Sequence, residues 1–212
     1  MNTKKYWDSV AGKKEFTAPF DAALLESFVD KGARILDVGC GYGRIISELH
    51  ENGYKNLTGI DFSGKMIERA KKLCPYASFS VKTGDEIDFT DNSFDCVLLF
   101  AVLTCIIADE EQIKLMEEIQ RVLKSGGIVY INDFLLNTDE RNIKRYEEFK
   151  EKYAKFGVFE LPEGAVLRHH DEQYIKKLLS GFSELSFKKS VYNTMNGNKT
   201  NGFCFLGNKN KT

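Results

Sequence analysis

The stretch Arg34-Ile35-Leu36-Asp37-Val38-Gly39-Cys40-Gly41-Tyr42-Gly43-Arg44 decides the fold, because an apolar run leads directly into three alternating glycines. The pattern predicts a buried strand, a glycine loop and then a helix. Glycine suits positions where the backbone takes a positive φ or where a ligand lies against the chain. The spacing is GxGxG, whereas a dinucleotide loop has GxGxxG and faces a pyrophosphate. An acid at Asp37 before this tighter turn favours a ligand with an ammonium group and no phosphate.

Acidic residues follow the next two predicted strands. Residues 57–60 form a short apolar run that ends in Asp61, about twenty residues after the glycine loop, where an acid can reach two ribose hydroxyls. Phe62 offers a flat face for an adenine ring, and Ser63 is a suitable N-cap for a helix over residues 65–73. A third strand over residues 78–82 leads into Thr83-Gly84-Asp85-Glu86.

Strands and helices continue to alternate after this point. Residues 94–100 read as a fourth strand, and residues 109–124 as a helix with Asp109 as its N-cap. A fifth strand follows over residues 128–134. Such alternation predicts a parallel sheet with helices on both faces and a ligand at the carboxyl ends of the strands.

In this order and spacing, residues 30–135 resemble the class I (Rossmann-like) S-adenosylmethionine-dependent methyltransferases. The run Arg121-Val122-Leu123-Lys124-Ser125-Gly126-Gly127 looks like the family's RVLKPGG element, with Ser125 in place of proline. The resemblance implies an α/β fold with a seven-stranded, mostly parallel sheet and a C-terminal antiparallel strand pair. It also implies S-adenosylmethionine as cofactor and S-adenosylhomocysteine as product. The cofactor-lining residues would be Asp37, Gly39, Cys40, Gly41, Gly43, Arg44, Asp61, Phe62, Asp85, Glu86 and Phe100, with Asp85 accepting from the adenine amino group.

We expect residues 1–212 to form a single methyltransferase domain, since this length can bury a full α/β core. Residues 1–30 would be N-terminal lid helices, 31–135 the cofactor-binding core, 136–182 an acceptor-side insertion and 183–212 the closing strand pair. In the last part, residues 185–192 and 202–206 read as strands, with Asn196-Gly197 as a turn signal between them.

The acceptor site is predicted less sharply. The resemblance directs attention to the N-terminal segment and the insertion, which contain the acceptor-binding candidates Tyr6, Trp7, Phe16, Tyr146 and Arg168. His169 and His170 are candidate catalytic residues, because histidine can take a proton near neutral pH. The alternatives are that the N-terminal aromatic residues only anchor a helix on the core, and that one histidine caps the helix beginning near Asp171.

Composition narrows the class of substrate. The formal net charge of −1 and pI near 6.3 give no sign of a phosphate-binding surface, so we expect no nucleic acid partner. The end of the fourth strand, Phe100-Ala101-Val102-Leu103, also lacks the Asp/Asn-Pro-Pro-aromatic tetrapeptide of enzymes that methylate a flipped base. A small-molecule acceptor remains, in a protein that is a monomer or homodimer.

The five cysteines are odd in number, widely spaced and without a CxxC pair, which predicts reduced thiols, a cytoplasmic location and no metal site. No apolar run is long enough to span a membrane, so no membrane partner is expected. Two other functions stay open at this point: an NAD-dependent oxidoreductase and a non-catalytic S-adenosylmethionine-binding regulatory protein.

Overall fold

The computed structural model describes residues 3–84 and 86–210. Its helices are α1 (Thr3–Val10), α2 (Ala22–Glu26), α3 (Arg44–Glu51), α4 (Gly64–Leu73), the 3₁₀ turn η1 (Leu103–Cys105), α5 (Asp109–Val122), α6 (Glu140–Tyr153) and α7 (Glu172–Leu178). Its strands are β1 (Arg34–Val38), β2 (Asn56–Asp61), β3 (Ser78–Val81), β4 (Phe94–Phe100), β5 (Leu123–Phe134), β6 (Val158–Glu160), β7 (Val166–Arg168), β8 (Phe182–Asn193) and β9 (Lys199–Lys209).

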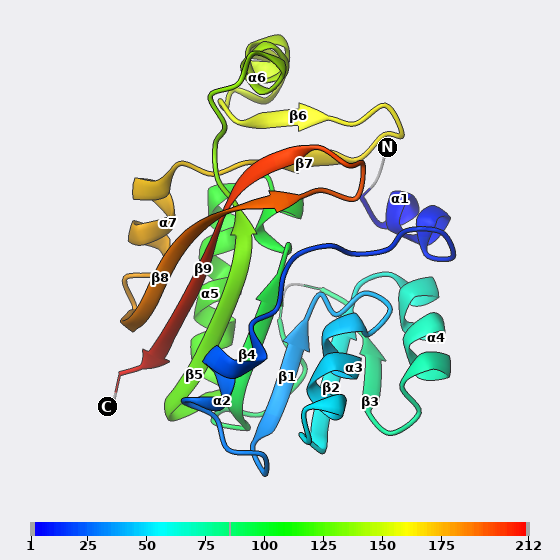
Figure 1. Ribbon diagram of the computed structural model, residues 1–212, viewed down its shortest axis with the longest axis vertical. Helices are drawn as coiled ribbons and strands as arrows, with labels where there is room; N and C mark the ends of the chain where they lie inside the picture. Colours follow the sequence, from blue (N-terminus) through cyan, green and yellow to red (C-terminus); the bar gives the residue numbers. More distant parts are fainter. Residues whose placement is uncertain (1–2, 85, 211–212) are drawn as a thin grey trace.

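Seven strands form one twisted sheet in the order β3-β2-β1-β4-β5-β9-β8 (Figure 1). Strands β1 to β5 run parallel, and β9 pairs antiparallel with both β5 and β8. This arrangement confirms the predicted mostly parallel sheet and its C-terminal antiparallel pair. The chain leaves β1 toward β2 on one side and later returns as β4 on the other, so the switch point lies between β1 and β4. In open α/β sheets a ligand crevice opens at this point.

Helices cover both faces of the sheet because its central strands are apolar on both sides. In β1 the four residues from Ile35 to Val38 are all buried. Ile35 belongs to a core that contains residues of α2, α3 and α4, whereas Leu36 belongs to a second core that contains residues of α5 and α7. Successive side chains of β1 therefore point to opposite faces of the sheet and pack into two separate cores.

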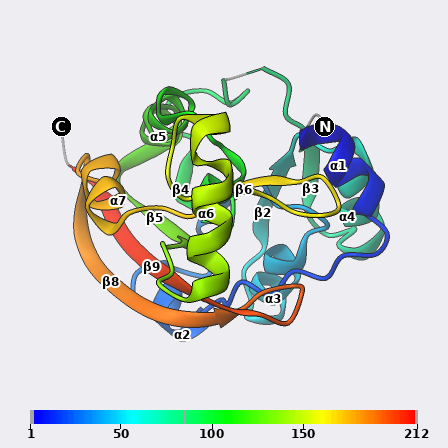
Figure 2. The ribbon, with the colours of Figure 1, turned by 90° about the horizontal axis from the view of Figure 1, so that it is seen from above.

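The insertion forms a cap above the carboxyl ends of the parallel strands, and α6 crosses that end of the molecule when seen from above (Figure 2). Residues 155–171, whose structure the sequence does not indicate, contain the antiparallel hairpin β6–β7. A bridge between Leu135 and His170 joins this segment to the end of β5. In this article the cap means α6, β6 and β7.

The N-terminal segment continues from α1 as an extended strap, defined here as residues 11–21. Tyr42 accepts a hydrogen bond from the Phe16 backbone (3.1 Å), and Arg44 donates to the Ala18 carbonyl. Helix α1 is tied to α4 because the Ser63 hydroxyl donates to Asp8 Oδ1 at 2.6 Å. Two residues of the glycine loop region thus hold the strap in place.

Two predicted helix caps have different outcomes. Ser63 caps α4 as predicted, since its hydroxyl accepts from the Met66 N–H at 3.2 Å. The prediction for Asp109 is wrong, because Ala108 occupies the N-cap position of α5 and Asp109 is its first helical residue. The Asp109 carboxylate instead pairs with Lys155 and Arg168 at 2.5 Å each.

Candidate functional site

A cavity of about 690 Å³ opens at the carboxyl ends of β1, β2, β4 and β5. Its floor is formed by residues that directly follow or end these strands: Gly39, Asp61, Ala101 and Phe134. The strap, the cap and the turn between β8 and β9 form its walls. The cavity therefore occupies the switch point that the sheet topology defines.

The glycine loop has the backbone conformation that its sequence predicts. Gly39 and Gly41 have φ angles of +74° and +53°, which side chains with a Cβ rarely adopt. A Cβ on Gly39 would lie 2.6 Å from Val102 Cγ2, and one on Gly41 would lie 2.1 Å from Phe16 Cε2. Only glycine lets the first turn approach β4 and lets the strap lie against the second.

Asp61 fastens this loop to the end of β2. Its Oδ2 accepts from the Gly41 N–H at 2.9 Å, and its Oδ1 accepts from the Ser63 N–H at 2.8 Å. Burial raises the pKa of this carboxyl, while the two backbone donors act against that rise. Asp61 lines the cavity beside Phe62, so its remaining lone pairs can accept hydroxyl hydrogens from a ligand.

Asp37 is the second buried acid of the site. It is 1% exposed, and within the described chain its Oδ2 has no hydrogen-bond partner. Burial raises its pKa to about 7, although the nearby Arg44 charge draws the pKa down. A buried carboxyl with a free oxygen one residue before the cavity lining fits an ammonium group.

These features fit S-adenosylmethionine. The glycine turns admit a ligand close to the backbone, Asp61 can hold ribose hydroxyls, Phe62 offers an adenine-sized flat face, and Asp37 fits the amino group of the methionine part. The other predicted cofactor residues lie elsewhere. Asp85 lies outside the described residues, and the predicted cofactor residues that do not line the cavity are Asp37, Cys40, Gly41, Gly43, Arg44, Glu86 and Phe100.

These residues have other contacts. Gly43 is the N-cap of α3 with φ +85°, and Arg44 joins the strap to Glu48. The Phe100 ring packs edge-on against Phe20 and Tyr130. Cys40 is buried in the core behind the loop. In these positions they support the loop and the strap.

The N-terminal aromatic residues divide into two groups. Trp7 and Phe16 line the cavity and pack edge to face at 5.8 Å. Tyr6 is 1% exposed and does not line it; its ring packs edge to face against Trp7 of the same helix, 5.1 Å between ring centres. Tyr6, which was predicted to bind the acceptor, therefore lies outside the lining of the cavity.

His169 lines the acceptor end of the cavity. Its Nδ1 lies 2.6 Å from the Tyr146 hydroxyl and 3.1 Å from Asn137 Nδ2. Burial lowers the pKa of His169 well below its usual value, and the Arg145 charge adds to the effect. The imidazole is therefore neutral at pH 7, with one nitrogen held by the protein.

His170, the second catalytic candidate, does not line the cavity. Gln112 Nε2 lies 2.9 Å from His170 Nε2, and the Phe134 carbonyl lies 3.2 Å from His170 Nδ1. The Phe134 carbonyl can only accept, so His170 Nδ1–H donates to it and Nε2 is left as an acceptor beside the Gln112 amide nitrogen. Both nitrogens are engaged, and burial lowers the pKa to about 3.

Two predicted acceptor-binding residues also lie behind the cavity wall. Tyr146 is fully buried and reaches the cavity only through His169. Arg168 is paired with Asp109 and donates to the Ile107 carbonyl at 3.0 Å, which anchors β7. Of the predicted acceptor-binding and catalytic residues, the cavity thus brings together Trp7, Phe16 and His169.

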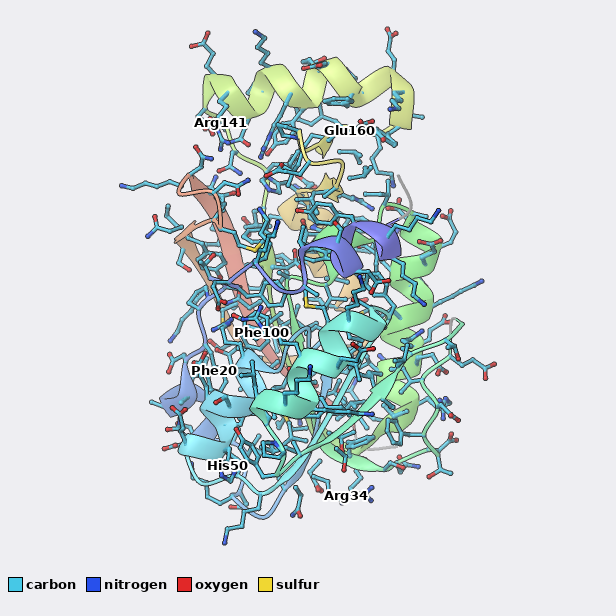
Figure 3. The ribbon with its side chains drawn as sticks, turned by 90° about the vertical axis from the view of Figure 1, so that its right-hand side faces the viewer. Phe20, Arg34, His50, Phe100, Arg141 and Glu160 are labelled. Atoms are coloured by element: carbon cyan, nitrogen blue, oxygen red, sulfur yellow. The ribbon has the colours of Figure 1, made fainter. Side chains whose placement is uncertain are left out.

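Several cavity residues are missed by sequence reasoning. Arg141 and Arg145 lie one turn apart on α6 and both line the cavity with Phe159 of β6. Figure 3 shows Arg141 beneath α6, on the side that faces the rest of the molecule. The i, i+4 spacing of two arginines was the available signal, but such spacing is equally common on solvated helix faces.

Two negative findings apply to residues 3–84 and 86–210. Histidine, cysteine and acidic side chains there form no group of three that could hold a metal ion. Within the same part of the chain, every helix is too short or too polar to cross a bilayer.

Comparison with known proteins agrees with this geometry. A family model described as a methyltransferase domain matches residues 36–131. A solved S-adenosylmethionine-dependent methyltransferase from Methanosarcina mazei is 28% identical with a TM-score of 0.86, over 92% of this chain and 100% of that one.

Curated relatives are similar over shorter stretches. A ubiquinone/menaquinone biosynthesis C-methyltransferase from Geotalea daltonii is 31% identical over 61% of this chain and 54% of that protein. An eEF1A lysine and N-terminal methyltransferase from Xenopus laevis is 34% identical over 49% of this chain and 16% of that protein. The chain thus spans only part of these relatives. The matched domain, the sheet and the glycine loop support a class I S-adenosylmethionine-dependent methyltransferase.

Proposed function

We propose that the protein transfers a methyl group from S-adenosylmethionine to a small-molecule acceptor inside the cavity described above. The observation that carries this proposal is the joint placement of Gly39, Asp61 and His169 on one cavity, with Asp37 directly behind it. When bound, the cofactor supplies an electrophilic methyl group on a sulfonium sulfur. The protein's contribution is to position the acceptor and to keep water out.

The enclosure supports a small acceptor over a protein one. A volume of about 690 Å³ falls within the range of roughly 300 to 1,000 Å³ that small-molecule sites occupy. The cap and the strap both contribute walls, which favours an acceptor small enough to fit between them. The eEF1A-modifying relatives make a protein acceptor the second candidate, and a lysine side chain or an N-terminus is the part that would enter.

His169 is the residue that we propose to handle a proton. Its neutral imidazole contacts the cavity, and Tyr146 and Asn137 fix the ring from behind. Neutrality leaves it able to hydrogen-bond an acceptor hydroxyl or amine, and orienting such a group is as important as removing its proton.

A calorimetric titration with S-adenosylmethionine, S-adenosylhomocysteine and NAD tests the cofactor part. We expect the two sulfur nucleotides to bind at micromolar concentration. In Asp61→Ala their affinity should fall by about 10- to 150-fold, because hydrogen bonds to a charged acceptor contribute roughly 1.5–3 kcal/mol. Asp88→Ala is the matched control, since Asp88 is exposed and does not line the cavity.

Binding of NAD alone would overturn the proposal and favour an oxidoreductase. Binding of S-adenosylmethionine without transfer to any small acceptor, but with methylation of a lysine-containing or free N-terminal peptide, would move the assignment to the protein-modifying class. Melting curves of both Asp61 and Asp88 variants separate a lost ligand contact from a lost fold.

A further inference from the structure

Arg145 is a half-buried cation in the wall of the cavity. Its Nε is buried and has no hydrogen-bond partner, and no described carboxylate forms an ion pair with its guanidinium. Arg168, by contrast, has a side chain that is 6% exposed and pairs with Asp109 at 2.5 Å. Burying part of a charge without an ion pair costs free energy. The contacts of Arg145 with the Tyr146 side chain and the Phe159 ring bring no negative charge, so an anionic ligand in the cavity can supply the missing ion pair.

Aromatic and aliphatic side chains beside Arg145 line an apolar part of the cavity, called here the slot. Its guanidinium lies 3.5 Å from the centre of the Phe159 ring. The His169 ring lies 4.9 Å from Phe159 and 5.7 Å from Phe134. Leu161 and Leu167 complete this apolar wall. A planar ligand body can stack here while an acidic substituent reaches the guanidinium.

Arg141 strengthens the positive end of the slot. It lies one helical turn before Arg145, lines the same cavity and is held only loosely by Asp139, at 4.0 Å from Nε to Oδ1. That carboxylate already caps α6 through Asn142. A guanidinium pair with this spacing presents a fork of donors to both oxygens of a carboxylate.

The charges of the residues that line the whole cavity also favour a negatively charged ligand. Among the described residues, five cationic side chains and two carboxylates line the cavity, whereas the chain as a whole has a net charge of −1. The cations are Lys4, Lys82, Lys114, Arg141 and Arg145, and the carboxylates are Asp61 and Glu111. S-adenosylmethionine has a sulfonium, an ammonium and one carboxylate group, so its net charge of about +1 adds to the positive charge of the cavity even when its carboxylate pairs with one cation. A negatively charged acceptor accounts for the excess of cations.

We infer that the acceptor is a planar, unsaturated or aromatic carboxylic acid whose carboxylate binds Arg145 and Arg141 and whose ring lies against Phe159 and Phe134. This inference rests on the proposed function and names the substrate class of that same site. Arg145 is then a specificity-determining residue, and the acceptor's charge also stabilises any proton that His169 holds.

The test uses benzoate as a probe, its neutral isostere benzamide, and phenyl phosphate, each titrated into the protein saturated with S-adenosylhomocysteine. We expect benzoate to bind at least 10-fold more tightly than benzamide and more tightly than phenyl phosphate. Arg145→Met, which keeps the length of the side chain without its charge, should remove the preference for benzoate. Lys144→Met on the same helix is the matched control, because Lys144 is exposed and does not line the cavity.

Each outcome decides one point. Equal binding of benzoate and benzamide in the wild-type protein, which needs no variant, would overturn the inference, and tighter binding of phenyl phosphate would replace the carboxylate with a phosphate ester. If Arg145→Met does not fold, Arg145→Lys should retain part of the preference. S-adenosylhomocysteine binding is measured first in every sample, so its failure would contradict the proposed function separately from the acceptor class.

Discussion

Asp37 shows how one buried carboxyl can link cofactor binding to pH. The carboxyl has a pKa of about 7 because burial disfavours its charge, and its Oδ2 is free of partners within the described residues. An ammonium group placed beside it favours the ionised form. Binding of a ligand with such a group below pH 7 must then release a proton from Asp37.

We therefore predict that the affinity for S-adenosylmethionine falls by up to about tenfold per pH unit below pH 7. Titration calorimetry from pH 5.5 to 8.5 in two buffers of different ionisation enthalpy measures both the affinity and the released proton. Asp37→Asn should lose most of this slope and bind more weakly at pH 8. Adenosine, which lacks the amino acid part, is the control ligand, and an equal slope for adenosine would contradict the role assigned to Asp37.

The same pKa has a consequence for the ligand-free protein. The unfolded carboxyl releases its proton near pH 3.8 and the native one near pH 7, so the native state binds more protons between these values. Its contribution to stability accordingly falls as pH rises through this window. Asp37→Asn should therefore be more stable than wild type at pH 8, by about 1 to 3 kcal/mol, despite binding the cofactor less well.

For His169 the pH dependence of its contribution to stability has the opposite sign to that of Asp37. Burial lowers the pKa of this base well below 6.5, so the unfolded chain binds more protons than the native state on the acid side of that value. We predict that the His169 imidazole stays neutral at pH 6 in the S-adenosylhomocysteine complex, and that benzoate raises its pKa through charge attraction. NMR of ring-labelled protein measures this, with His169→Gln assigning the signal. A charged ring at pH 7 would contradict the proposed proton-handling role.

At the level of elements, the sequence was sufficient wherever a local pattern determines the structure. The buried run of β1, the alternating glycines, and the acid at the end of β2 predicted the sheet and the floor of the site, because strand burial and turn geometry depend on neighbouring residues. Ser63 as the cap of α4 was predictable for the same reason.

Prediction was poorer where contacts between distant segments decide the outcome. The sequence pattern predicts Asp109 as a helix N-cap. Its carboxylate instead pairs with Arg168 and Lys155, which are far away in the sequence. The sequence does not distinguish the two adjacent histidines as catalytic candidates. Only the fold places His169 at the cavity and His170 beside Gln112. The hairpin β6–β7 has three residues in each strand, too few for a period to be recognised.

At the scale of the whole molecule, three segments far apart in the sequence meet above the cavity through one side chain. Lys14 of the strap donates to Asn196 Oδ1 in the β8–β9 turn at 3.2 Å and lies 3.5 Å from Glu163 in the β6–β7 turn. Residues on both sides of these contacts, including Phe16, Leu161 and Asn198, line the cavity. Lys14 is thus a clasp between the strap, the cap and the C-terminal strand pair.

We predict that Lys14→Met increases the dissociation rate of S-adenosylhomocysteine by about two- to fivefold and leaves the melting temperature nearly unchanged. The size follows from the exposure of the pair, since partly exposed ion pairs contribute only about 0.2–1 kcal/mol. Stopped-flow displacement measures the rate, and 0.5 M salt should bring the wild-type rate toward that of the variant, because salt screens such a contact. Lys13→Met is the matched control, as Lys13 is exposed and does not line the cavity. Equal rates for wild type and Lys14→Met at low salt would show that the three segments close the cavity without this clasp, and that packing of Phe16 on Tyr42, 4.9 Å between ring centres, holds the strap instead.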